Sequence, residues 1–114
     1  MGKQETEMLK GTLEGIVLAV LAARPAYGYE ITARLREQGF SDLVEGTIYA
    51  VLVRIEQKRL VDVDKVPSEK GPPRKVYSLN TGGRQQLEEF WRTWSFLAER
   101  IEQLHNAQAG EGEA

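Results

Sequence analysis

Apolar positions at helical spacing divide the first half of the chain into three short segments. Between residues 9 and 23, apolar side chains recur every three or four positions until Pro25, which predicts a helix over about 9–23. A second helix is predicted over about 28–38, where the pattern ends at Gly39. A third is predicted over about 45–59. We therefore expect the first half of the chain to be helical apart from short loops.

The periodicity changes from helical to alternating after residue 60. Residues 60–67 alternate imperfectly between valine and charged side chains, and residues 76–80 form a second short run, so both are predicted as β-strands. The connection over 68–75 combines glycine, prolines and positive charge, which is typical of a hairpin turn. Thr81 can cap a final helix that runs to about residue 106.

The order helix, helix, helix, strand, strand, helix indicates a mainly α (α+β) fold. It predicts a winged helix-turn-helix domain, with three helices and a two-stranded wing, followed by one long C-terminal helix. In helix-turn-helix proteins the last core helix enters the major groove of DNA. The expected organisation is an N-terminal arm over 1–8, the DNA-binding domain over 9–80, a C-terminal dimerisation helix over 81–106 and a disordered tail over 107–114.

The helix predicted over 45–59 has two different faces. Its apolar residues cluster on one side, and small or polar residues fall roughly opposite, namely Ala50, Val53, Arg54 and Gln57. Small side chains let a helix approach a DNA groove closely. Alternatively, Ala50 and Val53 simply cover a neighbouring helix. The basic hairpin that follows favours the DNA interpretation.

Composition excludes several chemistries. The chain has 114 residues, no cysteine and one histidine, so thiolate metal sites, disulfides, cysteine nucleophiles and His-rich metal sites are excluded. No nucleophile–base pair or phosphate loop is present, and we expect neither enzyme activity nor a cofactor. The longest apolar run, 16–23, is shorter than the ~20 residues of a membrane span, and no signal peptide is visible. These features predict a cytoplasmic protein without a membrane partner.

Charge is unevenly distributed, although the net charge is only −2. Residues 45–84 hold eight basic and five acidic side chains, whereas residues 85–114 hold two basic and six acidic ones. Phosphate binding depends on local potential, so a mildly acidic total does not exclude a DNA partner. Ordinary scatter remains the alternative explanation of this difference.

Three separated segments stand out: GTIYAVLVRIEQKRLV at 46–61, YGYEI at 27–31 and the wing region at 71–87. Together they resemble the PadR-type winged-helix transcriptional regulators of bacteria. The run GTIYAVLVRIEQKRLV at 46–61 is similar to their Gly-Thr-Leu-Tyr, Arg-Leu-Glu and Gly-Leu-Ile steps. YGYEI at 27–31 is similar to His-Gly-Tyr-x-Ile, and 71–87 resembles the wing and the step into the last helix. The resemblance covers about residues 9–104. Pro72 and Arg59 depart from it, because the family often has arginine and glycine there.

This resemblance implies a DNA-binding surface on the third helix and the wing. Thr47 and Tyr49 would lie at the DNA near the start of the helix, where their hydroxyls can reach phosphate or a base edge. Alternatively, Tyr49 is a core aromatic, Arg54 pairs with Glu56 or with the first helix, and Lys70 is a solvated turn lysine. Charge would be added along the helix by Arg54 and Lys58, and on the wing by Lys70, Arg74 and Lys75.

The last predicted helix carries an apolar stripe at heptad spacing. A partner helix would bury such a stripe, so we expect a homodimer in which this helix docks on its counterpart and on the first helix of the other subunit. A dimer also presents two recognition helices to half-sites about 34 Å apart. Alternatively, the helix folds back on its own domain. The stripe consists of Leu87, Phe90, Trp94, Leu97, Ile101 and Leu104.

The run WRTWSFLAERIEQL at 91–104 resembles the last helix of multidrug-sensing PadR-type repressors, in which a tryptophan from each subunit stacks on flat aromatic drugs. The matching residue is Trp94. Phe90 and Leu97 would line this effector site, and Met8 could close it. Alternatively, the interface is filled and has no cavity.

These inferences predict a ligand-responsive, sequence-specific repressor that binds a pseudo-palindromic operator in double-stranded DNA; repression is the family expectation. The alternative is a winged-helix protein-interaction module without specific DNA binding. Charged residues on the wing, Arg74 and Lys75, argue against that alternative.

Overall fold

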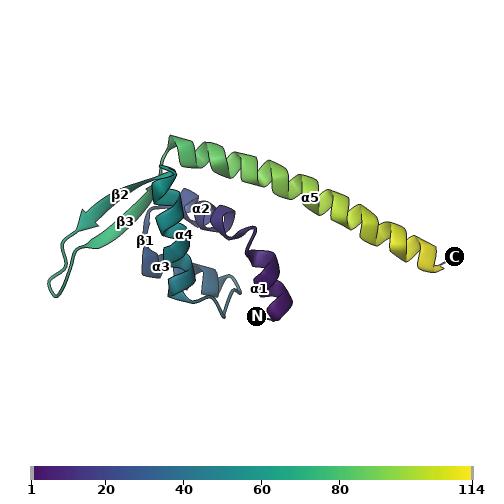
Figure 1. Cartoon of the computed structure of the whole chain (residues 1–114), viewed down its shortest axis with the longest axis horizontal. Coiled ribbons are helices and arrows are strands. Elements are labelled where there is room, and N and C mark those ends of the chain that lie inside the picture. The colour runs from purple at the N-terminus through teal and green to yellow at the C-terminus, as the bar shows by residue number, and fades with distance from the viewer. Residues whose placement is uncertain (1, 114) are drawn as a thin grey trace.

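The computed structural model describes residues 2–113 and has a compact domain from which one long helix projects (Figure 1). Its extents of 67 × 30 × 20 Å reflect that projection. Within these residues the elements are α1 (Lys3–Leu9), α2 (Leu13–Ala23), β1 (Ala26–Tyr27), α3 (Gly28–Glu37), α4 (Glu45–Gln57), β2 (Val61–Val66), β3 (Arg74–Leu79) and α5 (Thr81–Glu113).

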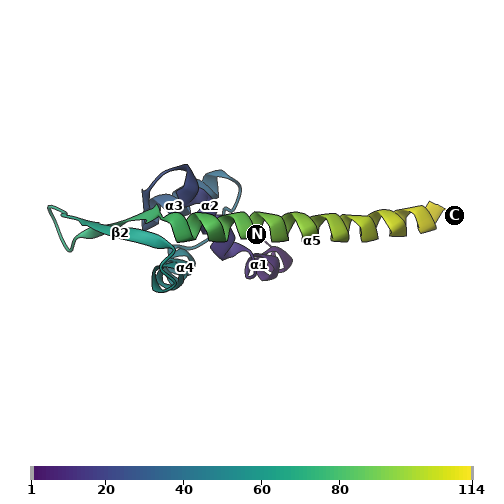
Figure 2. The same ribbon diagram turned by 90° about the horizontal axis from the view of Figure 1, so that it is seen from above.

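The core lies between α2, α3 and α4. Its apolar side chains come from the stripes that the sequence pattern marks, because burying one face of each helix is what stabilises so short an element. Seen from above, α2 and α3 lie on one side of the α5 axis and α1 and α4 on the other (Figure 2). The most completely buried side chains are Val17, Leu18, Leu21, Ile31, Leu35, Ile48, Val51, Leu52 and Ile55. The predicted winged-helix fold is confirmed.

The wing is the hairpin of β2 and β3, and it belongs to a three-stranded antiparallel sheet in the order β1-β3-β2. Val61 pairs with Leu79, and Val66 with Arg74 near the tip of the wing. The short strand β1 adds Ala26 opposite Tyr77 at the other edge of β3. The sequence predicts only two strands, because a two-residue strand is too short to produce an alternating pattern.

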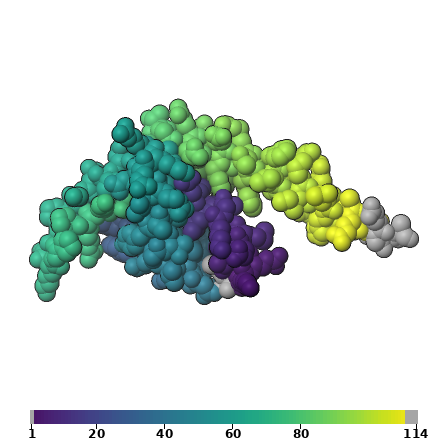
Figure 3. Space-filling view, viewed as in Figure 1, coloured from purple at the N-terminus to yellow at the C-terminus, as the bar shows by residue number. Residues whose placement is uncertain are grey.

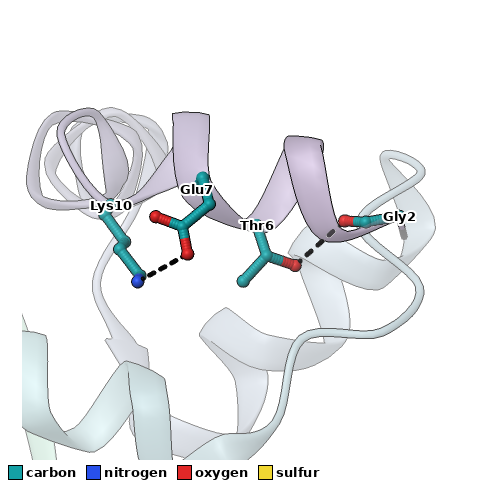
Figure 4. A network of polar contacts seen from close by, with 4 residues as sticks. All are labelled: Gly2, Thr6, Glu7 and Lys10. Atoms are coloured by element: carbon teal, nitrogen blue, oxygen red, sulfur yellow. Dashed lines mark hydrogen bonds and ion pairs between the residues drawn. The ribbon is translucent and has the colours of Figure 1, made fainter.

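The N-terminal region differs from the prediction of an arm followed by a helix from residue 9. Residues 3–9 form α1, and the chain then turns before α2 begins at Leu13, with the Thr12 N–H donating to the Leu9 carbonyl at 2.9 Å. Figure 4 shows two local polar contacts of α1: Thr6 donates to the Gly2 carbonyl at 3.2 Å, and Lys10 pairs with Glu7 at 2.9 Å. Exposed polar residues dominate α1, so periodicity alone could not predict it.

The end of α4 shows how the chain turns into the wing. Arg59 has φ of +58°, in the left-handed region that favours glycine. The Leu60 N–H donates back to the Ile55 carbonyl at 2.9 Å, which completes the helix end. This position is where the sequence departs from the family's glycine, so arginine here adopts the conformation that a glycine would adopt more easily.

Helix α5 begins and ends differently from the prediction. Its first turn is capped by Asn80 rather than Thr81, because the Gly83 N–H donates to Asn80 Oδ1 at 2.8 Å. The helix also continues past residue 106 to Glu113, where the sequence predicts a disordered tail. Adding one residue to an existing helix requires no new nucleation, so a long helix extends through weakly helix-forming residues. Much of α5 extends beyond the compact domain (Figure 3).

Candidate nucleic-acid interface

A cleft of about 620 Å³ lies between α4 and the wing. We call it the wing cleft. Its residues come from the N-terminus of α3, one side of α4, and the wing with its connecting loop. It combines tyrosine rings and positive charges with one carboxylate, that of Glu56. Its lining includes Tyr29, Tyr49, Glu56, Lys70, Arg74 and Lys75.

The outer face of α4 is exposed, as a recognition helix requires. Val53 is 54% exposed and Ala50 is also exposed, so neither covers a neighbouring helix of this chain. An exposed valine on a helix is not stabilising in water. Beside a DNA groove, however, small apolar side chains allow close approach and can contact the thymine methyl group.

Tyr49 lies at the edge of this face and depends on Gly28. It is 41% exposed, so it is not a core aromatic. A Cβ atom at position 28 would lie 2.5 Å from the tyrosine ring, which only glycine avoids. Gly28 at the start of α3 therefore permits the position of Tyr49 in the cleft. The glycine of the motif YGYEI thus leaves room for Tyr49, which is distant from it in the sequence.

An aromatic cluster supports the wing at the start of α3. Tyr27 and Tyr29 stack with ring centroids 5.6 Å apart and planes inclined by 9°. The Arg74 guanidinium lies 5.5 Å from the centroid of Tyr29, within the range of a cation–π interaction. Sequence reasoning did not select Tyr27 or Tyr29. The recurrence of tyrosine in YGYEI was the available signal, but its contact with the wing is visible only in three dimensions.

Tyr77 forms the base of the same cleft. Burial raises the pKa of its hydroxyl above the ordinary value of 10.0, and the charge of Glu56 and the nearby Tyr49 raise it further. Tyr77 therefore stays neutral at physiological pH and can donate a hydrogen bond.

The sequence-predicted DNA residues fall into two groups. Tyr49, Lys70, Arg74 and Lys75 line the wing cleft. Thr47, Arg54 and Lys58 are exposed but lie on a different side of α4 at 100° per residue. Lys58 pairs with Glu14 of α2 at 2.9 Å, so part of its charge is engaged away from the cleft. Spacing in the sequence could not reveal this partner.

The heptad stripe on α5 divides between the domain and solvent. Leu87 is buried in the domain core, and Phe90 is partly buried against Gly15 of α2. These two residues pack within their own domain. The prediction that all six stripe residues form a dimer surface is therefore corrected: Leu87 belongs to the domain core, and Phe90 is partly covered by α2. The rest of the stripe, which we call the α5 stripe, is exposed and consists of Trp94, Leu97, Ile101 and Leu104.

A second hollow, of about 550 Å³, lies between α1, α2, α5 and the turn after α3. We call it the aromatic hollow. It contains three of the four predicted effector residues, Met8, Phe90 and Trp94. Leu97 is not among its lining residues, because it lies beyond the part of α5 that faces the domain. Trp91 joins the lining instead, with its ring centroid 5.2 Å from that of Phe90. The heptad pattern did not indicate Trp91.

The three-helix core, the wing and the basic cleft define a winged-helix DNA-binding protein. Residues 17–89 match the sequence profile of the Transcriptional regulator PadR-like family. The chain belongs to this family and is therefore a DNA-binding transcriptional regulator. Within the described residues, no helix has the length and apolarity that crossing a membrane requires.

Solved structures of the same class resemble most of the chain. A PadR-like transcriptional regulator from Bacillus cereus is 37% identical, with a TM-score of 0.75 over 86% of this chain and 95% of that one. A Streptococcus transcriptional regulator is 40% identical, also with a TM-score of 0.75, over 85% and 95%. A PadR family regulator from Eggerthella lenta is 29% identical, with a TM-score of 0.80 over 89% and 88%. The long C-terminal helix is thus part of a shared architecture.

Proposed function

We propose that the protein represses transcription as a homodimer bound to a pseudo-palindromic operator. The observation that carries this proposal is the α5 stripe, whose large apolar side chains are left exposed by the single chain. Leu104, near the far end, is 72% exposed. A helix that extends beyond its domain with such a stripe is stabilised when a second copy covers it. Pairing through α5 would also hold two wing clefts in one assembly.

On DNA, the two walls of the wing cleft would have different roles. The outer face of α4 would enter the major groove, with Tyr49 contacting phosphate or base edges from the cleft and Thr47 contacting them from the other side of the helix. Lys70 and Arg74 on the wing would contact the backbone beside the groove. Occlusion of a promoter by such a complex would give repression.

The aromatic hollow supports the further proposal of an effector site. Its lining is rich in aromatic rings and lies beside the surface that a second α5 would cover. A flat heteroaromatic ligand stacked on Trp94 would favour one spacing of the two α5 helices. Operator affinity would fall if that spacing separated the two recognition helices from their half-sites, because a ligand shifts an equilibrium only through differential affinity.

Operator binding is tested by a gel shift of the purified chain on DNA upstream of its own gene, repeated across salt concentrations. We expect a discrete, salt-sensitive complex that survives competitor DNA. Tyr49→Ala and Arg74→Ala should weaken it. Weak binding of equal strength to every sequence tested would favour the alternative of a protein-interaction module.

The effector proposal is tested by tryptophan fluorescence during titration with flat heteroaromatic compounds. Trp94→Ala should abolish saturable quenching, and Trp91→Ala should weaken it. For any compound that binds, operator affinity is then measured with and without it. Equal affinities in the two conditions would show that binding has no regulatory effect.

A further inference from the structure

A carboxylate lies in the surface that is proposed to face DNA phosphates. Glu56 is on the same side of α4 as Tyr49 and Val53, which precede it by seven and three residues. All three line the wing cleft. An acidic side chain at this place opposes the binding of a polyanion, so its presence needs an explanation other than phosphate recognition.

The carboxylate has one cationic neighbour, on the opposite wall of the cleft. Lys75 Nζ on β3 lies 3.5 Å from Glu56 Oε1, and both side chains are roughly two-fifths exposed. An exposed ion pair of this kind contributes little to folding stability. Its effect on the potential of the cleft is larger, because the pair neutralises one of the few cations that the wing presents. The raised pKa of Tyr77, to which Glu56 contributes, agrees with a negative charge directed into the cleft.

We propose that Glu56 competes with DNA phosphate for Lys75 and thereby limits sequence-independent binding. This inference rests on the proposed function of the wing cleft as the DNA interface. In the free protein Lys75 is paired within the chain. On DNA, it either leaves Glu56 to reach a phosphate or remains paired and neutralises none. In both cases, general affinity for DNA is lower than the number of wing cations suggests.

The consequence is a gain in discrimination. Non-specific binding arises from phosphate neutralisation, whereas specific binding adds base contacts. The carboxylate weakens complexes that depend on phosphate neutralisation alone more than the operator complex, in which base contacts fix the register of the wing and let Lys75 reach one defined phosphate. Because non-specific complexes are weaker, less of the protein is bound at competing sites and more is available for the operator. Glu56 is therefore a specificity-determining residue that acts through repulsion.

The chain offers a matched control for this proposal. Glu14 and Lys58 form a second ion pair between two elements, at 2.9 Å, and neither residue lines the wing cleft. Glu14→Gln changes net charge by the same amount as Glu56→Gln, but away from the cleft. A comparison of the two variants separates a local effect from a change in overall charge.

The experiment measures equilibrium binding of the full chain to an operator duplex and to a scrambled duplex of equal length across a range of salt. The operator duplex is the upstream fragment that the wild-type chain shifts. The proteins are wild type, Glu56→Gln, Lys75→Gln, the double variant and Glu14→Gln. We expect Glu56→Gln to bind scrambled DNA roughly tenfold more tightly at low salt, with its log–log salt slope steeper by about one.

Three further results are expected. The ratio of operator to scrambled affinity should fall in Glu56→Gln. The steeper slope should disappear when Lys75→Gln is added, because the released cation is then absent. Glu14→Gln should match wild type, because the Lys58 that it releases lies outside the wing cleft. If Glu56→Gln does not fold in a thermal melt, Glu56→Ala removes the same carboxylate at a helical position that alanine favours.

Binding by Glu56→Gln that is equal to or weaker than wild type on both duplexes would overturn the proposal and indicate that the pair only braces the wing. An equal gain in Glu14→Gln would also overturn it. Failure of the wild-type chain to bind either duplex is a separate result, because it rejects the proposed DNA interface itself.

Discussion

The wing cleft and the aromatic hollow differ in how completely one chain builds them. The cleft is formed by α3, α4 and the wing, and its tyrosines, cations and Glu56 contact one another within the same chain. The hollow is lined mainly by apolar and aromatic side chains, and the α5 stripe beside it has no cover in the described chain. A single chain thus builds the proposed DNA-contacting cleft completely. The proposed dimer and effector site would require a second chain to cover the α5 stripe.

The largest effect is expected from charge placed on the α5 stripe. The double change Leu97→Glu and Ile101→Glu would bury like charges in a dimer, so the dimer should dissociate. Loss of the second half-site should lower operator affinity by at least about 100-fold, given that each mismatched base pair alone costs about 1–3 kcal/mol. Light scattering after gel filtration gives the mass, and a gel shift gives the affinity.

Gln103→Glu is the control, because it adds charge to α5 outside the stripe. A double variant that remains dimeric, or a wild-type chain that is monomeric, would contradict the role of α5 and leave the wing cleft as the complete functional unit.

The next effect concerns the cleft alone. Gly28→Val should displace Tyr49, because even a Cβ atom at position 28 would lie 2.5 Å from its ring. We expect a loss of about 1–3 kcal/mol in the free energy of unfolding from overpacking, and weaker DNA binding at unchanged dimer mass. Gly110→Ala is the control, since no heavy atom outside the helix lies within 4 Å of a Cβ there. Normal DNA binding by Gly28→Val would show that the position of Tyr49 is unimportant.

A smaller effect is expected from the stack that supports Arg74. Tyr29→Leu removes the aromatic face under the guanidinium, and an exposed cation–π contact is worth about 0.5–1 kcal/mol, so operator affinity should fall about two- to fivefold. Tyr29→Phe keeps the ring and should bind like wild type. In an Arg74→Ala background, Tyr29→Leu should have no further effect; an additive loss would indicate that Tyr29 itself contacts DNA.

The smallest effect is a change in alkaline stability. The folded pKa of Tyr77 is raised above its unfolded value of 10.0, so the neutral hydroxyl contributes stability that is complete below pH 10 and is lost as pH rises through the folded pKa. Chemical denaturation at pH 8 and pH 11 should show a smaller decline for Tyr77→Phe than for wild type. Equal declines would indicate that other groups control alkaline unfolding.

Much of the candidate DNA-binding surface could be predicted from sequence, and much of the proposed effector surface could not. The family resemblance predicts Tyr49, and the resemblance together with hairpin charge predicts Arg74 and Lys75; all three line the wing cleft. The contacts of Tyr29 and Glu56 with the wing were missed because they join residues 45 and 19 positions apart. Trp91 was missed because the heptad pattern describes a helix and not the neighbours that the helix meets.

The sequence by itself determined the order of the main elements (α2, α3, α4, β2, β3 and α5), the core faces of α2, α3 and α4, and the family. These depend on local periodicity and on motifs whose residues lie close together in the chain. Only the tertiary structure decided that Lys58 pairs with Glu14 and that Leu87 is buried in its own domain. It also placed Glu56 against Lys75 across the cleft. Such pairings depend on which helix faces meet after packing, and one-dimensional spacing does not contain that information.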